Sequence, residues 1–161
     1  MLKGDVEMIF KRSIWVFHLN TGGCNACDIE ILDILTPFHD VERFGIKLVP
    51  TPRHADVILL TGPITRETLP KVVEAVNAVP NPKVIIAIGS CACGGGIWYD
   101  TYATLGGVNT LLEMLKKEYN IDVNTIYVPG CPPRPEAIIY GVLLALDKVK
   151  QRLKRVEYKE A

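Results

Sequence analysis

The sequence lacks a net charge, a long apolar run and the cysteines of a disulfide framework. Eighteen basic residues balance eighteen acidic ones, so no positive field is available to hold a nucleic-acid backbone. The longest apolar stretches, around 84–88 and 137–146, fall well short of the roughly 20 residues that cross a bilayer. Residues 1–12 carry scattered charges and no signal-peptide core. We therefore expect no nucleic-acid partner, and membrane attachment only through other subunits.

Length and composition are ordinary for a globular protein. The chain has 161 residues, of which 48% are hydrophobic and 22% charged, and it contains no internal repeat, low-complexity segment or linker. We expect residues 1–161 to form a single domain with a short N-terminal extension and a polar C-terminal helical tail. Five cysteines cannot all pair within one chain, which favours metal or redox use of the thiols.

Apolar periodicity predicts strands and helices that alternate along the chain. Because this alternation is typical of a parallel sheet with helices on both faces, ligand sites are expected beyond the carboxyl ends of the strands. The expected strands are 13–19, 56–61, 83–88 and 125–128, and the expected helices are 25–35, 66–79, 109–119 and 136–156.

Cysteines follow three of the predicted strands. Cys24 and Cys27 form a Cys-x2-Cys pair at the start of a helix, whose free amide groups stabilise thiolate. Cys91 lies in a glycine-rich loop, and Cys131 precedes two prolines that fix the chain direction. Four thiolates are what a [4Fe-4S] cluster requires, so we predict that these loops converge on one cluster. Cys93 is an alternative to Cys91 as the ligand from this loop. We favour Cys91 only because it follows its strand more directly.

Each motif has a simpler interpretation. A Cys-x2-Cys pair alone also fits a thioredoxin-like redox pair or half of a zinc site, and four thiolates also fit structural zinc. Glu30 is a candidate proton relay, but Asp28 and Glu30 equally fit first-turn acids that complement the helix dipole. Arg53 fits either a positive group near the cluster or a solvated side chain.

Other residues are interpreted from their type and position. Trp98, Tyr99 and Tyr102 indicate a partner surface or a cover for the cluster, with core packing as the alternative. The three histidines, His18, His39 and His54, lack metal-ligand spacing and are expected to be structural.

Several segments together resemble the small subunit of energy-converting, membrane-bound [NiFe] hydrogenases. They are also similar to the homologous cluster-bearing subunit of respiratory complex I. The resemblance implies a flavodoxin-like fold with one [4Fe-4S] cluster, the ligands Cys24, Cys27, Cys91 and Cys131, and an acid near the cluster at Glu30. It is carried by residues 24–30 (CNACDIE), 52–56 (PRHAD), 62–65 (GPIT), 89–92 (GSCA) and 127–136 (YVPGCPPRPE).

The spacing of the first cysteine pair separates the branches of this family. Complex I subunits carry adjacent cysteines there, whereas this chain has the spaced pair of hydrogenases, with Ala26 where many hydrogenases have glycine. We expect neither the twin-arginine leader nor the further two-cluster domain that uptake-type small subunits have. The resemblance therefore implies that a ferredoxin-like iron–sulfur subunit delivers the electrons.

The resemblance also implies the partners. The expected function is electron transfer to a [NiFe] hydrogenase-type large subunit, which reduces protons to hydrogen and alone carries the NiFe centre. Membrane subunits of an ion-pumping complex would hold the chain on the cytoplasmic side of the membrane. An equivalent subunit of a complex I-like quinone oxidoreductase or of a sulfane sulfur reductase is the alternative.

Overall fold

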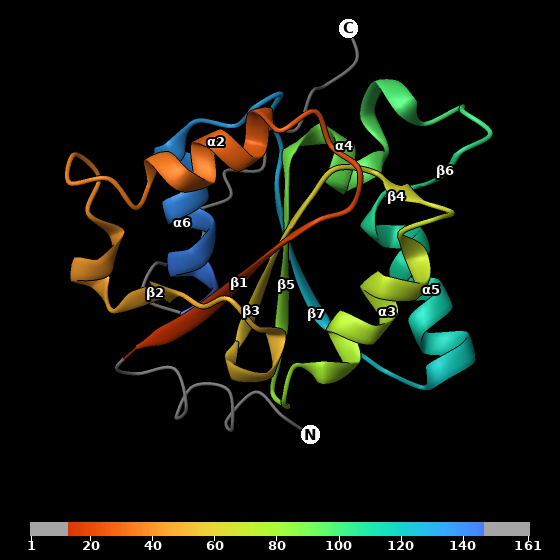
Figure 1. Ribbon diagram of the computed structural model, residues 1–161, viewed down its shortest axis with the longest axis horizontal. Helices are drawn as coiled ribbons and strands as arrows, with labels where there is room; N and C mark the ends of the chain where they lie inside the picture. The colour runs from red at the N-terminus through yellow and green to blue at the C-terminus, as the bar shows by residue number, and fades with distance from the viewer. Residues whose placement is uncertain (1–12, 147–161) are drawn as a thin grey trace, which may run out of the picture.

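The computed structural model describes residues 13–146, whose centre is a parallel sheet of five strands (Figure 1). The strand order, β2-β1-β3-β5-β7, places the first strand between the second and third, as in flavodoxin-like folds. The predicted α/β class and parallel sheet are thereby confirmed. The strands are β1 (Ile14–Asn20), β2 (Ile46–Leu48), β3 (Val57–Thr61), β5 (Val84–Ile88) and β7 (Asn124–Val128).

Helices cover both faces of this sheet (Figure 1). On one face, α2 (Ala26–Asp33) and α6 (Pro135–Ala145) pack over a cluster that includes Val57 and Leu59 of β3. On the other, α3 (Leu69–Ala78) and α5 (Val108–Tyr119) pack over Ile58 and Leu60. All four side chains are fully buried, and burying each contributes about 1.5–3 kcal/mol. Successive side chains of one strand thus form both cores, which is why β3 is apolar throughout.

The helix boundaries differ from the sequence prediction, most clearly for α3 and α6. Helix α3 begins at Leu69, three residues late, because residues Ile64–Thr65 form β4 and pair with β6 (Thr104–Gly106). Helix α6 ends at Ala145, and the part of the predicted helix from residue 147 onward lies outside the described residues.

Lys83 is buried immediately before β5, where an apolar residue would be expected. Its ammonium group donates hydrogen bonds to the carbonyl oxygens of Val76 and Val79, at 2.6 and 3.0 Å. These carbonyls lie at the C-terminal end of α3, which has no intrahelical donor for them. Burial lowers the pKa of Lys83, and the two carbonyls compensate the cost of burying the cation.

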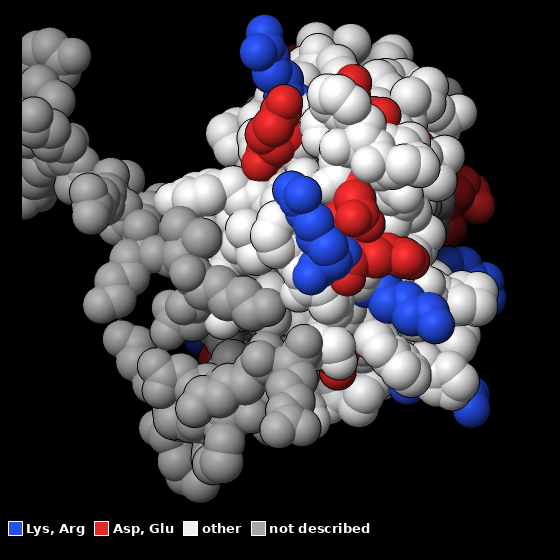
Figure 2. Space-filling view, turned by 90° about the vertical axis from the view of Figure 1, so that its left-hand side faces the viewer, with Lys and Arg blue, Asp and Glu red and all other residues white. Residues whose placement is uncertain are grey.

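The described surface agrees with the balanced composition. On the face shown in Figure 2, lysine and arginine side chains lie among aspartate and glutamate side chains, without a large patch of one sign. Within residues 13–146, none of the helices combines the length and apolar character that a bilayer span requires.

Candidate functional site

Four cysteines from three segments of the chain line one pocket where the strands end. The first cysteine segment, residues 21–27, follows β1; the second, residues 89–96, follows β5; the third, residues 130–133, follows β7. Parallel strands end at the same edge of a sheet, so the three segments meet there. The residues that line the pocket are Gly23, Cys24, Asn25, Ala26, Cys27, Asp28, Thr61, Gly62, Ser90, Cys91, Gly130, Cys131 and Pro132.

Asn20 organises the glycine turn of the first cysteine segment. Its amide oxygen accepts hydrogen bonds from the backbone N–H groups of Gly22 and Gly23, at 2.8 and 2.9 Å. Its amide nitrogen donates to Asn25 Oδ1 at 3.2 Å. Asn25 adopts the left-handed conformation, φ 68°, immediately before α2. One side chain at the end of β1 therefore connects both ends of the loop that carries Cys24.

Thr21 fastens this segment to the loop after β3. The side chain is fully buried, and its hydroxyl lies within hydrogen-bond distance of the carbonyl oxygens of Thr61, Gly62 and Pro63, at 2.9, 3.0 and 2.9 Å. The Thr68 hydroxyl in turn donates to the carbonyl oxygen of Thr21 at 2.9 Å. Side-chain hydrogen bonds thus fix the path of the first cysteine segment relative to the neighbouring strand.

The second cysteine segment opens with a helix that the sequence prediction treated as a loop. Helix α4 spans Gly89–Gly94, so Cys91 and Cys93 point roughly 160° apart, to opposite sides of the helix. Cys91 lines the pocket, whereas Cys93 packs against the core and its thiol donates to the Ala87 carbonyl at 3.5 Å. Gly89 has φ +90°, and a Cβ there would lie 2.5 Å from the Cys27 sulfur. Only glycine leaves room for that sulfur.

Backbone contacts hold the third cysteine segment against the second. The Gly130 carbonyl accepts hydrogen bonds from the Ser90 backbone N–H at 2.7 Å and from its hydroxyl at 3.1 Å. The peptide bond between Cys131 and Pro132 is cis. Cys131 is exposed, as is Cys24 of the first cysteine segment. The pocket therefore has two thiols at its surface and two that are partly buried.

The four thiols are close enough to influence one another electrostatically. Burial raises the pKa of Cys27 to about 11, and the negative charges of Asp28 and of the thiolates of Cys24, Cys91 and Cys131 add to the effect. Four thiolates here repel one another unless a positive group lies between them. An iron–sulfur core supplies such a charge, because its irons bind the deprotonated sulfurs.

The donor set fits a polynuclear group. Four cysteine thiols line the pocket, and four thiolates are the ligand set of a [4Fe-4S] cluster. Within residues 13–146, no three His, Cys, Asp or Glu side chains are grouped to hold a single metal ion. Burial and the charges of Cys131 and Cys24 raise the pKa of Cys91, while a hydrogen bond from the Ile97 backbone N–H lowers it. A backbone donor thus faces one of the sulfurs, as is typical around iron–sulfur clusters.

A hydrogen-bonded carboxylate forms part of the pocket wall. Asp28 Oδ1 lies 2.8 Å from His18 Nε2 and accepts a hydrogen bond from the Thr61 hydroxyl at 2.5 Å. Its Oδ2 accepts from the amide nitrogen of Asn20 at 2.5 Å. The Asp28 side chain is 14% exposed. This network joins β1, β3 and α2 directly beside Cys27.

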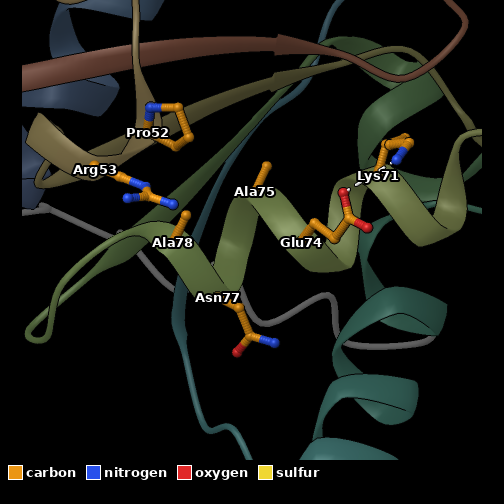
Figure 3. Close-up of a pocket in the computed structure, with 7 residues that line it drawn as sticks. All are labelled: Pro52, Arg53, Lys71, Glu74, Ala75, Asn77 and Ala78. Atoms are coloured by element: carbon orange, nitrogen blue, oxygen red, sulfur yellow. Dashed lines mark hydrogen bonds and ion pairs between the residues drawn. The ribbon is translucent and has the colours of Figure 1, made fainter.

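Two further candidates lie apart from the cysteine pocket. Glu30 is on α2, one turn beyond Cys27, and is absent from the pocket lining. Arg53 lies in the short 3-10 helix η2 (Pro52–His54), before β3 and thus at the opposite end of that strand. Figure 3 shows it in a separate pocket against α3, with Lys71 and Glu74. Of the two interpretations of Arg53, its position thus excludes a group near the cluster and agrees with an exposed, solvated side chain.

The aromatic residues after the second cysteine segment lie on the surface. Ile97, Tyr99 and Tyr102 are 81%, 70% and 91% exposed, and Trp98 is 43% exposed. Core packing, the simpler interpretation of these residues, does not account for such exposure. Large apolar groups at one exposed location indicate a contact surface.

Sequence reasoning missed the polar residues that hold the first cysteine segment. Asn20 and Thr21 directly precede two glycines, and Asn and Thr commonly bond to backbone groups in turns. Their position before the glycines is therefore a local sequence signal for this role. Thr61 has no such signal, because its contact with Asp28 joins residues far apart in the sequence.

Comparisons with known proteins agree on one family. Residues 24–145 match the family described as NADH ubiquinone oxidoreductase, 20 Kd subunit. A probable membrane-bound hydrogenase subunit of Pyrococcus furiosus is 48% identical over 143 residues, which are 89% of this chain and 80% of that protein. Formate hydrogenlyase subunit 7 of Escherichia coli is 40% identical over 152 residues, 94% of this chain. The chain spans 56% of the length of that second relative.

A solved structure shares the fold. A chain from the membrane-bound sulfane sulfur reductase, described as an archaeal respiratory membrane complex, superimposes with a TM-score of 0.68 at 33% identity. The match covers 91% of this chain and 75% of that one.

Proposed function

The chain belongs to the NADH ubiquinone oxidoreductase 20 kDa subunit family, and from this membership we propose that it is the electron-transfer small subunit of a membrane-bound [NiFe] hydrogenase. Members of this family are small subunits of hydrogenase and complex I-type oxidoreductases. The proposed activity is the passage of electrons from a ferredoxin-type subunit to a large subunit that reduces protons to hydrogen.

The observation that carries this proposal is the convergence of four thiols on one pocket. Cys24, Cys27, Cys91 and Cys131 would hold one [4Fe-4S] cluster, which accepts and donates one electron at a time. Gly89 leaves space for the Cys27 sulfur, and α4 directs Cys93 away from the pocket. Residues 1–161 act in this proposal as a single domain around that site.

The surface near the pocket supports a large partner subunit. Electron transfer weakens steeply with distance, so the cluster must lie close to the subunit that receives the electrons. Cys24 and Cys131 are exposed, and the aromatic surface, defined as Ile97, Trp98, Tyr99 and Tyr102, follows the second cysteine segment. We assign this surface to the contact with the large subunit. Attachment to the cytoplasmic side of a membrane would come through further subunits of the complex.

Glu30 is assigned as a proton relay beside this electron path. The residue lies one helical turn from Cys27, and it is partly buried. A carboxylate one helical turn from a cluster ligand can exchange protons through water when the cluster changes charge.

Anaerobic isolation of the native complex tests the proposal. The large subunit that co-purifies should contain two Cys-x2-Cys pairs and bound nickel, and the complex should evolve hydrogen from a reduced ferredoxin. A large subunit without nickel or without those pairs would refute the hydrogenase assignment.

The second candidate is the equivalent subunit of a sulfane sulfur reductase or a quinone oxidoreductase. Its support is the TM-score of 0.68 with a chain of the sulfane sulfur reductase at 33% identity. In this case the same isolation should yield a nickel-free complex that reduces polysulfide or quinone and produces no hydrogen.

A further inference from the structure

The carboxylate of Asp28 is held on the pocket wall in a fixed orientation. Its side chain is largely buried, it lines the same pocket as the four thiols, and it neighbours Cys27 in the chain. Hydrogen bonds reach both of its oxygens: from Asn20 at Oδ2, and from Thr61 at Oδ1, where His18 also lies 2.8 Å away. These contacts fix the orientation of the carboxylate relative to the cysteine pocket.

The orientation of Asn20 is determined by the backbone. Because its amide oxygen already accepts from the N–H groups of Gly22 and Gly23, its amide nitrogen must be the atom that faces Asp28. That nitrogen can only donate. Donors therefore reach both oxygens of the carboxylate and fix its orientation at the pocket wall.

Within residues 13–146, the contacts of Asp28 leave its charge without a lysine or arginine partner. Among the described residues, His18 is the one titratable partner of the carboxylate. The negative charge therefore acts on the pocket through a partly buried environment, where screening by water is weaker than at the surface.

We propose that Asp28, oriented by Asn20 and Thr61, is a tuning residue that lowers the reduction potential of the cluster bound by the four cysteines. Adding an electron makes the cluster more negative, and a fixed negative charge nearby opposes that step. This inference rests on the proposed function, because it presupposes a bound cluster. It concerns the driving force of electron transfer, and Asp28 binds no iron.

The test is a redox titration of the full chain with its cluster, isolated anaerobically and followed by electron paramagnetic resonance. Asp28→Asn keeps the size of the side chain and removes its charge. We expect the midpoint potential to rise so that, at a fixed ambient potential, the ratio of reduced to oxidised cluster increases about tenfold, or about 59 mV for one electron.

Asp33→Asn is the matched control. Asp33 is on the same helix and is also paired with a histidine, His39, at 3.1 Å, but its side chain is 45% exposed and does not line the pocket. In Asp33→Asn, the ratio of reduced to oxidised cluster at the same ambient potential should stay within about twofold of the wild-type ratio. Equal potentials for wild type and Asp28→Asn, or equal shifts in both variants, would overturn the proposal.

A second variant keeps the carboxylate in place. His18 lines a neighbouring surface pocket with Phe17, Leu48, Val49 and Pro50, which gives a longer side chain room. His18→Arg places a permanent positive charge beside Asp28 and should also raise the potential. An unchanged potential in His18→Arg would contradict the proposal even if Asp28→Asn failed to bind a cluster.

The outcomes separate the two hypotheses. Wild-type protein without iron and acid-labile sulfide would refute the proposed function itself. A cluster that is present in the wild type, and whose potential changes neither in Asp28→Asn nor in His18→Arg, would refute only the role of Asp28. Loss of the cluster in both Asp28→Asn and His18→Arg would mean that Asp28 supports the loop structurally. That result would also contradict a role in tuning the potential.

Discussion

The two walls of the cysteine pocket are held in different ways. Polar side chains hold the first cysteine segment: Asn20 bonds to the glycine turn, and Thr21 bonds to carbonyls of the adjacent loop. The second and third segments are held by backbone geometry, through the positive φ of Gly89 and the contact between Ser90 and the Gly130 carbonyl. The first wall is therefore sensitive to lost hydroxyl and amide groups, and the second to added bulk.

The largest effect is expected from removing a thiol of the backbone-held wall. Cys131→Ser should lose the cluster or change its type, because an alcohol is a much poorer ligand for iron than a thiolate. Cys93→Ser is the control and should retain the cluster, since Cys93 faces the core. Iron and sulfide analysis with electron paramagnetic resonance measures both, and the reverse pattern would contradict the ligand assignment.

Adding a methyl group at Gly89, on the same wall, should also have a large effect on stability and cluster binding. Gly89→Ala combines a backbone strain of about 1–3 kcal/mol with a Cβ only 2.5 Å from the Cys27 sulfur. We expect a lower melting temperature and a reduced iron content. Gly94→Ala, at the end of the same helix, meets nothing within 4 Å and should change stability by less than about 1 kcal/mol. Similar losses in both variants would mean that Gly89 is not needed for space.

On the wall held by side chains, Thr21→Val should lower the free energy of unfolding by about 1–3 kcal/mol, because buried carbonyl oxygens lose their hydrogen-bond donor. The matched control is Thr125→Val. Within the described residues the buried Thr125 hydroxyl has no hydrogen-bond partner, so valine should be neutral or stabilising. Denaturant unfolding measures the two free energies of unfolding. Equal values would show that the hydroxyl of Thr21 does not hold the loop.

The smallest effect on the isolated chain is expected at the aromatic surface. Trp98→Ala should change the free energy of unfolding by less than about 1 kcal/mol, yet weaken association with the large subunit at least about tenfold. Tyr119→Ala is the control, because Tyr119 is comparably exposed, at 47%, and lies at the end of α5. Co-purification and binding assays compare them. Unchanged assembly with Trp98→Ala would remove this surface from the interface.

Much of the fold was predictable because its signals are local. Apolar runs identified β1, β3, β5 and β7, and the glycine or proline settings placed each cysteine just after a strand. The short strands β2, β4 and β6 were missed. Two or three residues carry too little periodicity, and their pairing depends on distant partners.

The arrangement inside the site was less predictable. Whether Cys91 or Cys93 faces the pocket depended on α4, whose Gly-rich sequence has low intrinsic helix propensity. The sequence left two interpretations of Arg53 open, and the structure favours the solvated one, because the residue precedes β3 and lies at the end of the strand away from the cysteines. The network around Asp28 joins β1, β3 and α2, and such contacts become visible only when the strands are paired.

The central claim is that both walls of the pocket serve one [4Fe-4S] cluster. Mössbauer spectroscopy of the iron-57-labelled wild-type chain, isolated anaerobically and assayed for sulfide, tests it most directly. We predict about four irons and about four sulfides per chain, in one cluster with thiolate ligation. One zinc ion per chain without sulfide, or iron bound singly, would contradict the claim.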